Sequence, residues 1–309
     1  MAVVTRALLP DWLTTSALPF LKRLVDSGTK LRPKWYEQVL RMETTDRPHE
    51  QYDSYAKFGL MVQTDEGSAV TYDLPIQGFD KTLTPVDYSL GYKVSHRALK
   101  DDKLGPVKNL ASGLGESDTE TKNTVTADIF NQGFNSAFTG ADGVELFSTA
   151  HLREDGVAFR NELATAADFS ITSFRTALVD FRNFRDGRGK RRNLTVKWIM
   201  SAPDLYFDIA EVLESVGRPD TAENATNVTR RFFGGNNFSQ IINDYLTDTD
   251  AWFIGADKED HGLIFLEREP FTNATDVDFD TRTVKHAGWS TYDVDWVNNG
   301  IGVFGSSGG

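Results

Sequence analysis

The sequence predicts an α+β protein in which long, narrow elements extend from a smaller α/β layer. Three patterns predict it: period-2 alternation on both sides of residues 77–78, helical periodicity over residues 106–139, and mixed helix and strand patterns over residues 166–265. A long two-stranded hairpin is not stable alone in water. We therefore expect another copy of the chain to cover its apolar face.

The composition of the 309-residue chain is that of a globular protein, with 39% hydrophobic and 25% charged residues. No run approaches the roughly 20 apolar residues that a membrane-spanning helix needs. Pro10, Asp11 and Lys22 interrupt the apolar start, so a secretory signal is not expected. Cysteine is absent, which excludes disulfides and thiol chemistry. The formal net charge of -12 argues against a protein whose whole surface binds nucleic acid.

The first two elements are an arm and a hairpin. Residues 1–50 are expected to form an extended arm lying on another part of the molecule, because prolines interrupt their short apolar pieces. In residues 51–95, two alternating runs flank a turn at residues 77–78, which predicts a long β-hairpin with a polar tip. The apolar members of the two runs are Val70, Tyr72, Leu74 and Ile76, then Val86, Tyr88, Leu90, Tyr92 and Val94.

A long helix and a polar stretch follow the hairpin. Apolar residues three or four positions apart predict one helix over residues 106–139, ending at Gly140. The next stretch, GADGVELFSTAH, contains Asp142, Ser148 and His151, the residue types of a catalytic triad. Because a triad is defined in space and not by adjacent positions, a polar turn is the favoured interpretation. A hydrolase that uses His151 is the alternative.

Other sequence motifs that could indicate metal, nucleotide or calcium binding match poorly. The five histidines show no metal-binding spacing, and the matches to phosphate-binding and dinucleotide-binding motifs are incomplete. Asp276, Asp278 and Asp280 begin like a calcium loop, but Thr281 and Ala287 stand where that loop requires Gly and Glu. We therefore expect no catalytic residue, no metal and no cofactor.

The last part of the chain predicts an α/β sub-domain and long terminal strands. Its elements are a helix with apolar residues at 174–181, a strand at 194–201, a helix opened by Pro203, strands at 251–256 and 262–269, and long strands beyond residue 276. Helices alternating with strands are typical of a layered α/β arrangement. The terminal strands are expected to extend beyond it.

A basic loop, RDGRGKRRN over residues 185–193, lies within this sub-domain. It carries five basic side chains against the single Asp186, in a chain that is acidic overall. Two interpretations stay open. The loop is solvated, or Arg188, Arg191 and Arg192 form ion pairs with another subunit or an acidic partner, as guanidinium groups do with carboxylates.

Two stretches carry a resemblance to a known family. The first is FNSAFTGADGVELFSTAH, residues 134–151, in which a long helix leads into G-x-DG-x-x-LFS-x-x-H; the second is DVDWVNNGIGVFGSSG, residues 293–308. Together with the order of elements over essentially the whole chain, they resemble the major capsid protein of tailed bacteriophages, which has the Hong Kong 97-type fold. Within that family, the likeness is to the major head subunit of Mu-like phages.

The resemblance implies a Hong Kong 97-like fold with five parts. They are an N-terminal arm (1–50), an E-loop hairpin (51–95), a P-domain with the spine helix (96–165), an A-domain (166–265), and C-terminal P-domain strands that return to the A-domain (266–309). Because only about 50 residues precede the hairpin, the resemblance also implies a separate scaffolding protein.

The resemblance further implies a structural subunit without enzymatic activity. Its copies would form pentamers and hexamers of an icosahedral shell around double-stranded DNA, without sequence-specific DNA binding and without a membrane partner. A portal protein and a decoration protein are further expected partners, and the expected location is the virion after assembly in the host cytoplasm. Candidate intersubunit residues are Tyr72, Leu74, Ile76, Lys81, Arg188, Arg191 and Arg192, with Lys81 also a candidate cross-link position. An encapsulin-like nanocompartment shell and a phage tail or decoration protein are the alternatives.

Overall fold

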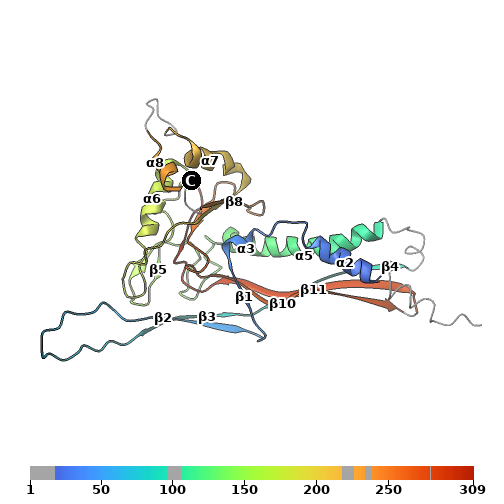
Figure 1. Cartoon of the computed structure of the whole chain (residues 1–309), viewed down its shortest axis with the longest axis horizontal. Coiled ribbons are helices and arrows are strands. Elements are labelled where there is room, and N and C mark those ends of the chain that lie inside the picture. The colour runs from blue at the N-terminus through green and yellow to red at the C-terminus, as the bar shows by residue number, and fades with distance from the viewer. Residues whose placement is uncertain (1–17, 96–105, 218–225, 234–237, 279) are drawn as a thin grey trace, which may run out of the picture.

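The computed structural model describes residues 18–95, 106–217, 226–233, 238–278 and 280–309 (Figure 1). The first 17 residues of the predicted arm therefore lie outside the described part. Two four-stranded sheets form the body, and a narrow two-stranded ribbon extends beneath it. This is the mixed α+β arrangement that the sequence predicts.

The longer sheet contains the two longest strands, β10 (Leu263–Asp278) and β11 (Thr283–Trp296). Its order is β1 (Arg41–Thr44), β10, β11 and β4 (Val86–Ser95). β1 is parallel to β10, and the other neighbours are antiparallel. The long helix α5 (Pro106–Asn131) packs along this sheet, against β11 and β4. The predicted long strands beyond residue 276 are thus the end of β10 and the whole of β11.

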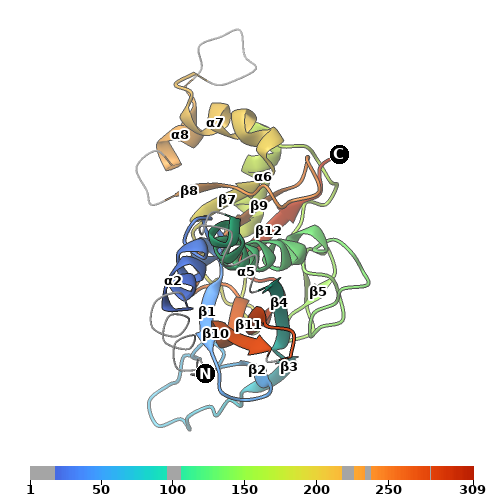
Figure 2. The ribbon, with the colours of Figure 1, turned by 90° about the vertical axis from the view of Figure 1, so that its right-hand side faces the viewer.

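The second sheet has the order β12 (Val303–Ser306), β9 (Trp252–Gly255), β7 (Trp198–Ser201) and β8 (Ser239–Ile242). The helices α6 (Ile171–Arg182) and α7 (Tyr206–Glu214) share one apolar cluster with one face of it, through residues such as Phe174, Ile209 and Ile254. A short 3₁₀ turn, η2 (Pro203–Leu205), opens α7, and α8 (Val228–Phe233) packs on α7. In Figure 2 this sheet lies above α5 and the longer sheet lies below it.

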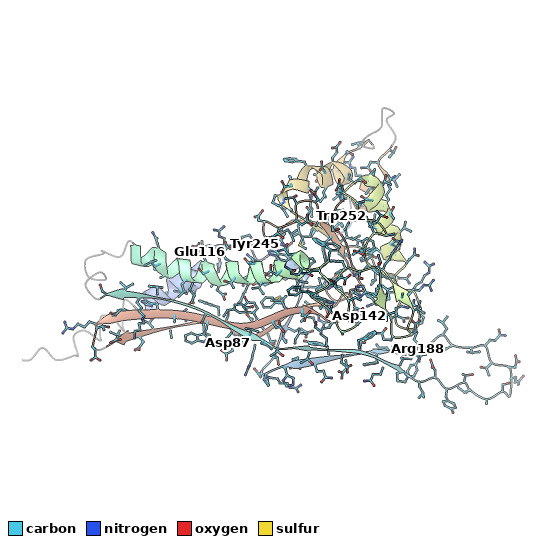
Figure 3. The ribbon with its side chains drawn as sticks, turned by 180° about the vertical axis from the view of Figure 1, so that it is seen from behind. Asp87, Glu116, Asp142, Arg188, Tyr245 and Trp252 are labelled. Carbon is cyan, nitrogen blue, oxygen red and sulfur yellow. The ribbon has the colours of Figure 1, made fainter. Side chains whose placement is uncertain are left out.

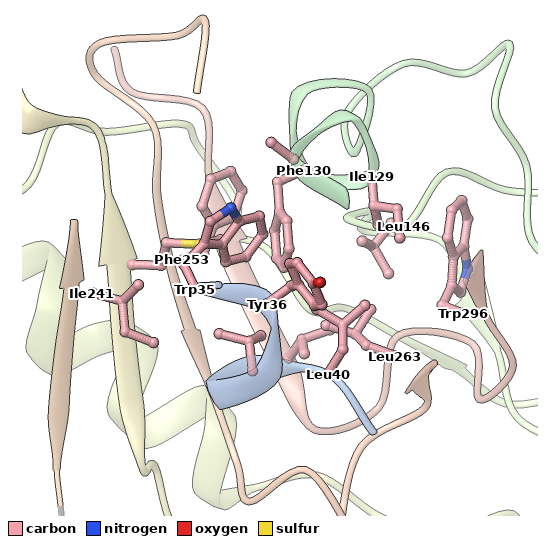
Figure 4. Packing of buried hydrophobic residues seen from close by; sticks show 14 of the residues in the cluster. Trp35, Tyr36, Leu40, Ile129, Phe130, Leu146, Ile241, Phe253, Leu263 and Trp296 are labelled. Atoms are coloured by element: carbon pink, nitrogen blue, oxygen red, sulfur yellow. The ribbon is translucent and has the colours of Figure 1, made fainter. Parts of the chain in front are cut away.

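The two sheets share one core at their junction. Trp35 and Tyr36, at the start of the short helix α3 (Tyr36–Val39), pack there with Phe130 at the end of α5 (Figure 4). Tyr36 stacks on Phe265 of the longer sheet with ring centroids 5.0 Å apart, and Phe130 contacts Phe253 of the other sheet at 5.2 Å. The two layers therefore form a single folded body.

The described part of the arm differs from the extended segment that its prolines predict. It forms a helix, α2 (Leu18–Gly28), packed on α5 so closely that a Cβ at Gly115 would lie 2.1 Å from the carbonyl oxygen of Val25. Pro19 falls in the first turn of α2, where a missing N–H costs nothing, and Pro33 follows the helix. One proline thus lies in the first turn and the other lies beyond the last, so neither breaks the helix.

The predicted pairing of the hairpin is wrong. β3 (Ile76–Leu83) pairs with β2 (Glu50–Ala56), whereas β4 pairs with β11 in the longer sheet. Residues 57–75 contain no regular strand, although Val70, Tyr72 and Leu74 alternate. Period-2 alternation marks the faces of a strand, but it does not identify the neighbouring strand.

Two further boundaries differ from the prediction. α5 ends at Asn131, before Gly140: the N–H groups of Gly133 and Asn135 bond the carbonyl oxygens three residues earlier, at Phe130 and Gln132, so the chain tightens into a turn. The strand expected at residues 262–269 belongs to β10 of the longer sheet and not to the α/β layer. Its register against Val294 and Trp296 of β11 fixes that assignment.

Candidate intersubunit surface

The polar stretch after α5 is a buried structural turn. Asp142 and His151 are fully buried side chains, and His151 Nδ1 lies 2.6 Å from Asp142 Oδ2. The other ring nitrogen, Nε2, faces the carbonyl oxygen of Leu146 at 3.1 Å. Ser148 is not within hydrogen-bonding reach of the imidazole: its Oγ accepts the N–H of Ala150 instead. The arrangement lacks the nucleophile–base contact that triad chemistry requires.

Asn161 joins the two stretches that carry the family resemblance. This buried amide donates to the carbonyl oxygens of Leu146, at 2.7 Å, and Gly300, at 3.2 Å, and accepts the N–H of Ser148 at 2.8 Å. Its backbone carbonyl accepts the N–H of Gly305 at 3.0 Å. Three side-chain bonds at one buried amide lock the post-helix turn to the C-terminal strand region. We call this set of contacts the buried junction.

Residues 57–75, which we call the projecting loop, extend beyond the body at the end of the β2–β3 ribbon (Figure 1). Most of its large apolar side chains face solvent: Phe58, Leu60, Met61, Val62, Val70, Tyr72 and Leu74 are each at least 61% exposed. A concentration of this kind on a protein surface marks an interaction site. Tyr72 and Leu74, which the sequence singled out, belong to it, whereas Ile76 is half-buried in β3.

The basic loop holds the base of the projecting loop. Arg188 donates through Nε to the carbonyl oxygen of Lys57 at 3.1 Å and through Nη2 to Asp73 Oδ1 at 3.1 Å and to the carbonyl oxygen of Leu74. Lys190 Nζ donates to the carbonyl oxygen of Phe58 at 2.7 Å. Figure 3 shows Arg188 where the loop leaves the body. Arg188 therefore binds the projecting loop of its own chain.

Asp73 is held as a carboxylate at this contact. The N–H of Gly59 donates to Asp73 Oδ2 at 2.7 Å, and this bond, with the Arg188 guanidinium, lowers the pKa of Asp73 below its ordinary value. Both sides of the loop are thus tied at their base, while the apolar side chains farther along it stay exposed.

Lys81 also has partners within the chain. Its Nζ lies 2.9 Å from Asp295 Oδ2, donates to the carbonyl oxygen of Thr139 at 3.2 Å, and sits 5.0 Å from the ring centroid of Trp296. Burial raises the pKa of Asp295, against the opposing effect of Lys81. The contact ties β3 of the ribbon to β11.

The other two candidate arginines bind only neutral oxygens. Arg191 Nη1 donates to Asn183 Oδ1 at 3.3 Å, and Arg192 Nη2 donates to the carbonyl oxygen of Asp260 at 3.2 Å. Their charges are therefore not matched by a carboxylate among the residues that the structure describes. This distinguishes them from Arg188.

The first half of the projecting loop was not predicted from the sequence as part of a contact surface. Phe58, Leu60, Met61 and Val62 form a short apolar run that precedes the alternating residues 70–76. This run, KFGLMV with its flanking Lys57, has neither helical nor period-2 spacing. Asn161 was not predicted either, because no spacing distinguishes a lone amide.

No metal site appears among the described side chains: they contain no cluster of three or more His, Asp or Glu residues suited to hold an ion. Over the same part of the chain, no helix has the length and apolar character needed to span a membrane.

A family model described as phage capsid protein matches residues 80–303. No curated protein sequence matches the chain significantly. The family match covers the end of the second predicted part, all of the third and fourth, and most of the fifth. It includes the whole of the stretch 134–151 and the stretch 293–308 as far as residue 303.

Solved structures of similar fold include several shells. The mature capsid of bacteriophage PhiM1 has a TM-score of 0.59 at 13% identity, over 89% of this chain and 87% of that one. A procapsid of bacteriophage JBD30 has 0.54 at 14% identity, over 98% and 76%. A virus-like particle from Pyrococcus furiosus has 0.55 at 11% identity, over 94% and 99%. At these identities the likeness shows the fold.

Proposed function

The chain belongs to the phage capsid protein family, and from this premise we propose that its copies enclose double-stranded DNA in an icosahedral shell built from pentamers and hexamers. The observation that carries the proposal is the projecting loop, because Tyr72 is 93% and Leu74 79% exposed in the single chain. Burying one such side chain contributes about 1.5–3 kcal/mol. A neighbouring copy is the proposed source of that burial, which makes assembly favourable.

The five predicted parts of the chain would have different structural roles in the shell. We assign residues 1–50 to the arm, 51–95 to the E-loop, 96–165 to the P-domain with spine helix α5, 166–265 to the A-domain, and 266–309 to returning strands. The pairing of β4 with β11 ties the end of the E-loop segment to the P-domain sheet. The E-loop that projects is therefore the β2–β3 ribbon with residues 57–75.

The proposed partners follow from this role. A separate scaffolding protein would guide assembly in the host cytoplasm, a portal protein would replace one pentamer, and a decoration protein would bind the outer face. The packaged DNA would make no sequence-specific contact. The net charge of -12 suits a container for DNA, since a strongly basic lining would retain the DNA by counterion release. The residues proposed to contact neighbouring subunits are Tyr72, Leu74, Ile76, Lys81, Arg188, Arg191 and Arg192.

A nanocompartment shell is the second candidate, favoured by the likeness to the virus-like particle from Pyrococcus furiosus. Such a shell would co-purify with a protein cargo in place of DNA. A hydrolase finds less support, because the His151 ring is fully buried and both its nitrogens are engaged. Likeness to Mu-like head subunits in particular stays a prediction.

The test is to produce the protein with and without a scaffolding protein and to image the purified product by negative-stain electron microscopy. Closed, uniform shells that contain nuclease-protected DNA in infected cells are expected. A monodisperse monomer under every condition would overturn the proposal, and shells filled with one protein species would favour the nanocompartment.

A further inference from the structure

Two opposite edges of the second sheet carry unpaired charge of opposite sign. The strand order β12–β9–β7–β8 leaves β12 and β8 at the ends. α6 contacts β12, and α7 is tied to β8, where Gln240 Nε2 donates to the carbonyl oxygen of Tyr206 at 3.3 Å. Figure 1 shows α6 and β8 on opposite sides of this layer. We call them the basic edge, which is α6, and the acidic edge, which is η2 with α7.

The acidic edge presents one stripe of carboxylates around an exposed aromatic ring. Asp204, Asp208 and Glu211 are exposed and stand four and then three positions apart, so they share one face of the helical segment. None of them forms an ion pair within the described part of the chain. Phe207 lies between them in this stripe and is 77% exposed. The exposed Phe207 ring among these unpaired carboxylates therefore marks a contact surface for another molecule.

The basic edge repeats the same spacing with the opposite sign. Arg175, Val179 and Arg182 also stand four and then three positions apart, and Val179 is 61% exposed. Arg175 donates to Thr229 Oγ1 and Arg182 to the carbonyl oxygens of Asn193 and Leu194, all neutral acceptors.

The carboxylate on α6 does not cancel this charge. Asp180, the single acidic residue of the helix, is already paired with Arg160 at 2.8 Å. Beyond the helix, the Arg185 side chain donates to the carbonyl oxygen of Gly189 at 2.7 Å and the Arg191 side chain to Asn183 Oδ1, and neither forms an ion pair with a described residue. The basic edge therefore continues into the loop that follows it.

We propose that the acidic edge of one copy packs against the basic edge of the next copy in each ring, with Phe207 seated on Val179 between Arg175 and Arg182. This rests on the proposed shell function and names the surface through which the α/β layers meet. Each copy carries both edges on opposite sides, so the contact is heterologous, and such contacts close into rings. Matched charges favour the correct orientation and disfavour like edges meeting.

The test compares two substitutions of similar size and opposite charge at one exposed position. Val179→Glu places a carboxylate against the acidic edge, whereas Val179→Lys places an ammonium group there. We expect the yield of closed shells, measured by gradient sedimentation and electron microscopy, to fall by about tenfold or more for Val179→Glu and to stay near wild type for Val179→Lys. Circular dichroism of both unassembled proteins checks that they fold.

The same pair is then made in the background Asp208→Lys/Glu211→Lys. There the preference at position 179 is expected to invert, with Glu tolerated better than Lys. Equal yields for the two substitutions, or the same ranking in both backgrounds, would overturn the edge pairing. Failure of the wild-type protein to form shells would instead overturn the proposed function, so the two failures are distinguishable.

Discussion

The buried junction and the projecting loop use their side chains in opposite ways. Asn161 at the junction and the neighbouring pair of His151 and Asp142 have their hydrogen-bond partners within the chain, and their side chains are closed to solvent. In the projecting loop, Arg188 and Lys190 tie down the base, while the apolar side chains point outward. The first arrangement stabilises the fold of one copy. The second leaves apolar surface that only another molecule can bury.

The largest effect is expected from the double substitution Tyr72→Ser/Leu74→Ser. Both side chains are exposed in the single chain, so the thermal unfolding of unassembled protein should be unchanged. Each truncation removes about 1.5–3 kcal/mol of apolar burial from every contact in the shell. Closed shells should therefore disappear in electron micrographs. Leu31→Ser, at a site 61% exposed on the body, is the control. Normal shells from the double variant would mean that the loop is not an assembly element.

Asn161→Ala should weaken the folded chain itself. The change leaves the N–H of Ser148 without its partner and removes one donor each from the carbonyl oxygens of Leu146 and Gly300, all in a fully buried site. We expect the free energy of unfolding, measured by urea denaturation of unassembled protein, to fall by about 3–5 kcal/mol. The exposed Asn109→Ala should change it by less than about 0.5 kcal/mol. A similarly small loss for Asn161→Ala would remove the distinction between the two regions.

A pH dependence is expected in the body, from His261. Burial lowers the pKa of this histidine from 6.5 to about 4, and its Nδ1 accepts the N–H of Leu263 at 3.2 Å. Between pH 6.5 and 4 the unfolded chain binds the proton and the folded chain does not. The stability is therefore complete above pH 6.5 and falls by about 3 kcal/mol as the pH drops toward 4.

Urea denaturation at several pH values measures this slope. His261→Gln should flatten it, leaving a smaller part from His286, whose pKa burial also lowers. An identical slope in the variant and the wild type would show that His261 is not the group that titrates.

The smallest effect is expected from Arg188→Gln. The variant loses the ion pair with Asp73 and weakens the bonds to Lys57 and Leu74, all near the surface. Solvent screens contacts of this kind, so their loss affects the local opening of the loop more than the global free energy of unfolding. Hydrogen exchange at Gly59, whose N–H binds Asp73, should quicken severalfold without a change in global stability. Arg32→Gln, which removes the exposed pair with Glu120, should leave that exchange unchanged. No acceleration in Arg188→Gln would contradict the role of the basic loop.

Long periodic elements could be predicted from the sequence. The helix from Pro106 and the strands beyond residue 276 repeat their spacing over several turns or pairs, so their type is clear. The partner of each strand could not be predicted, because β3 and β4 both alternate while one joins β2 and the other joins β11. Pairing depends on contacts between residues far apart in the chain.

The candidate site residues also differ in how strongly the sequence indicates them. Tyr72 and Leu74 were singled out because they alternate along a predicted hairpin whose apolar face another copy would cover, and both are exposed. Arg188 was expected in an ion pair with another subunit or an acidic partner, whereas its described partner, Asp73, lies in the same chain. Asn161 had no signal, since a single amide gains its role only when two distant stretches meet around it.

Hydrogen exchange of residues 57–75, compared between unassembled protein and closed shells, tests the central claim most directly. We predict fast exchange in the unassembled chain and strong protection throughout the projecting loop in the shell, because a neighbouring copy covers it. Equally fast exchange in both states would show that the loop stays exposed after assembly, and it would contradict the account.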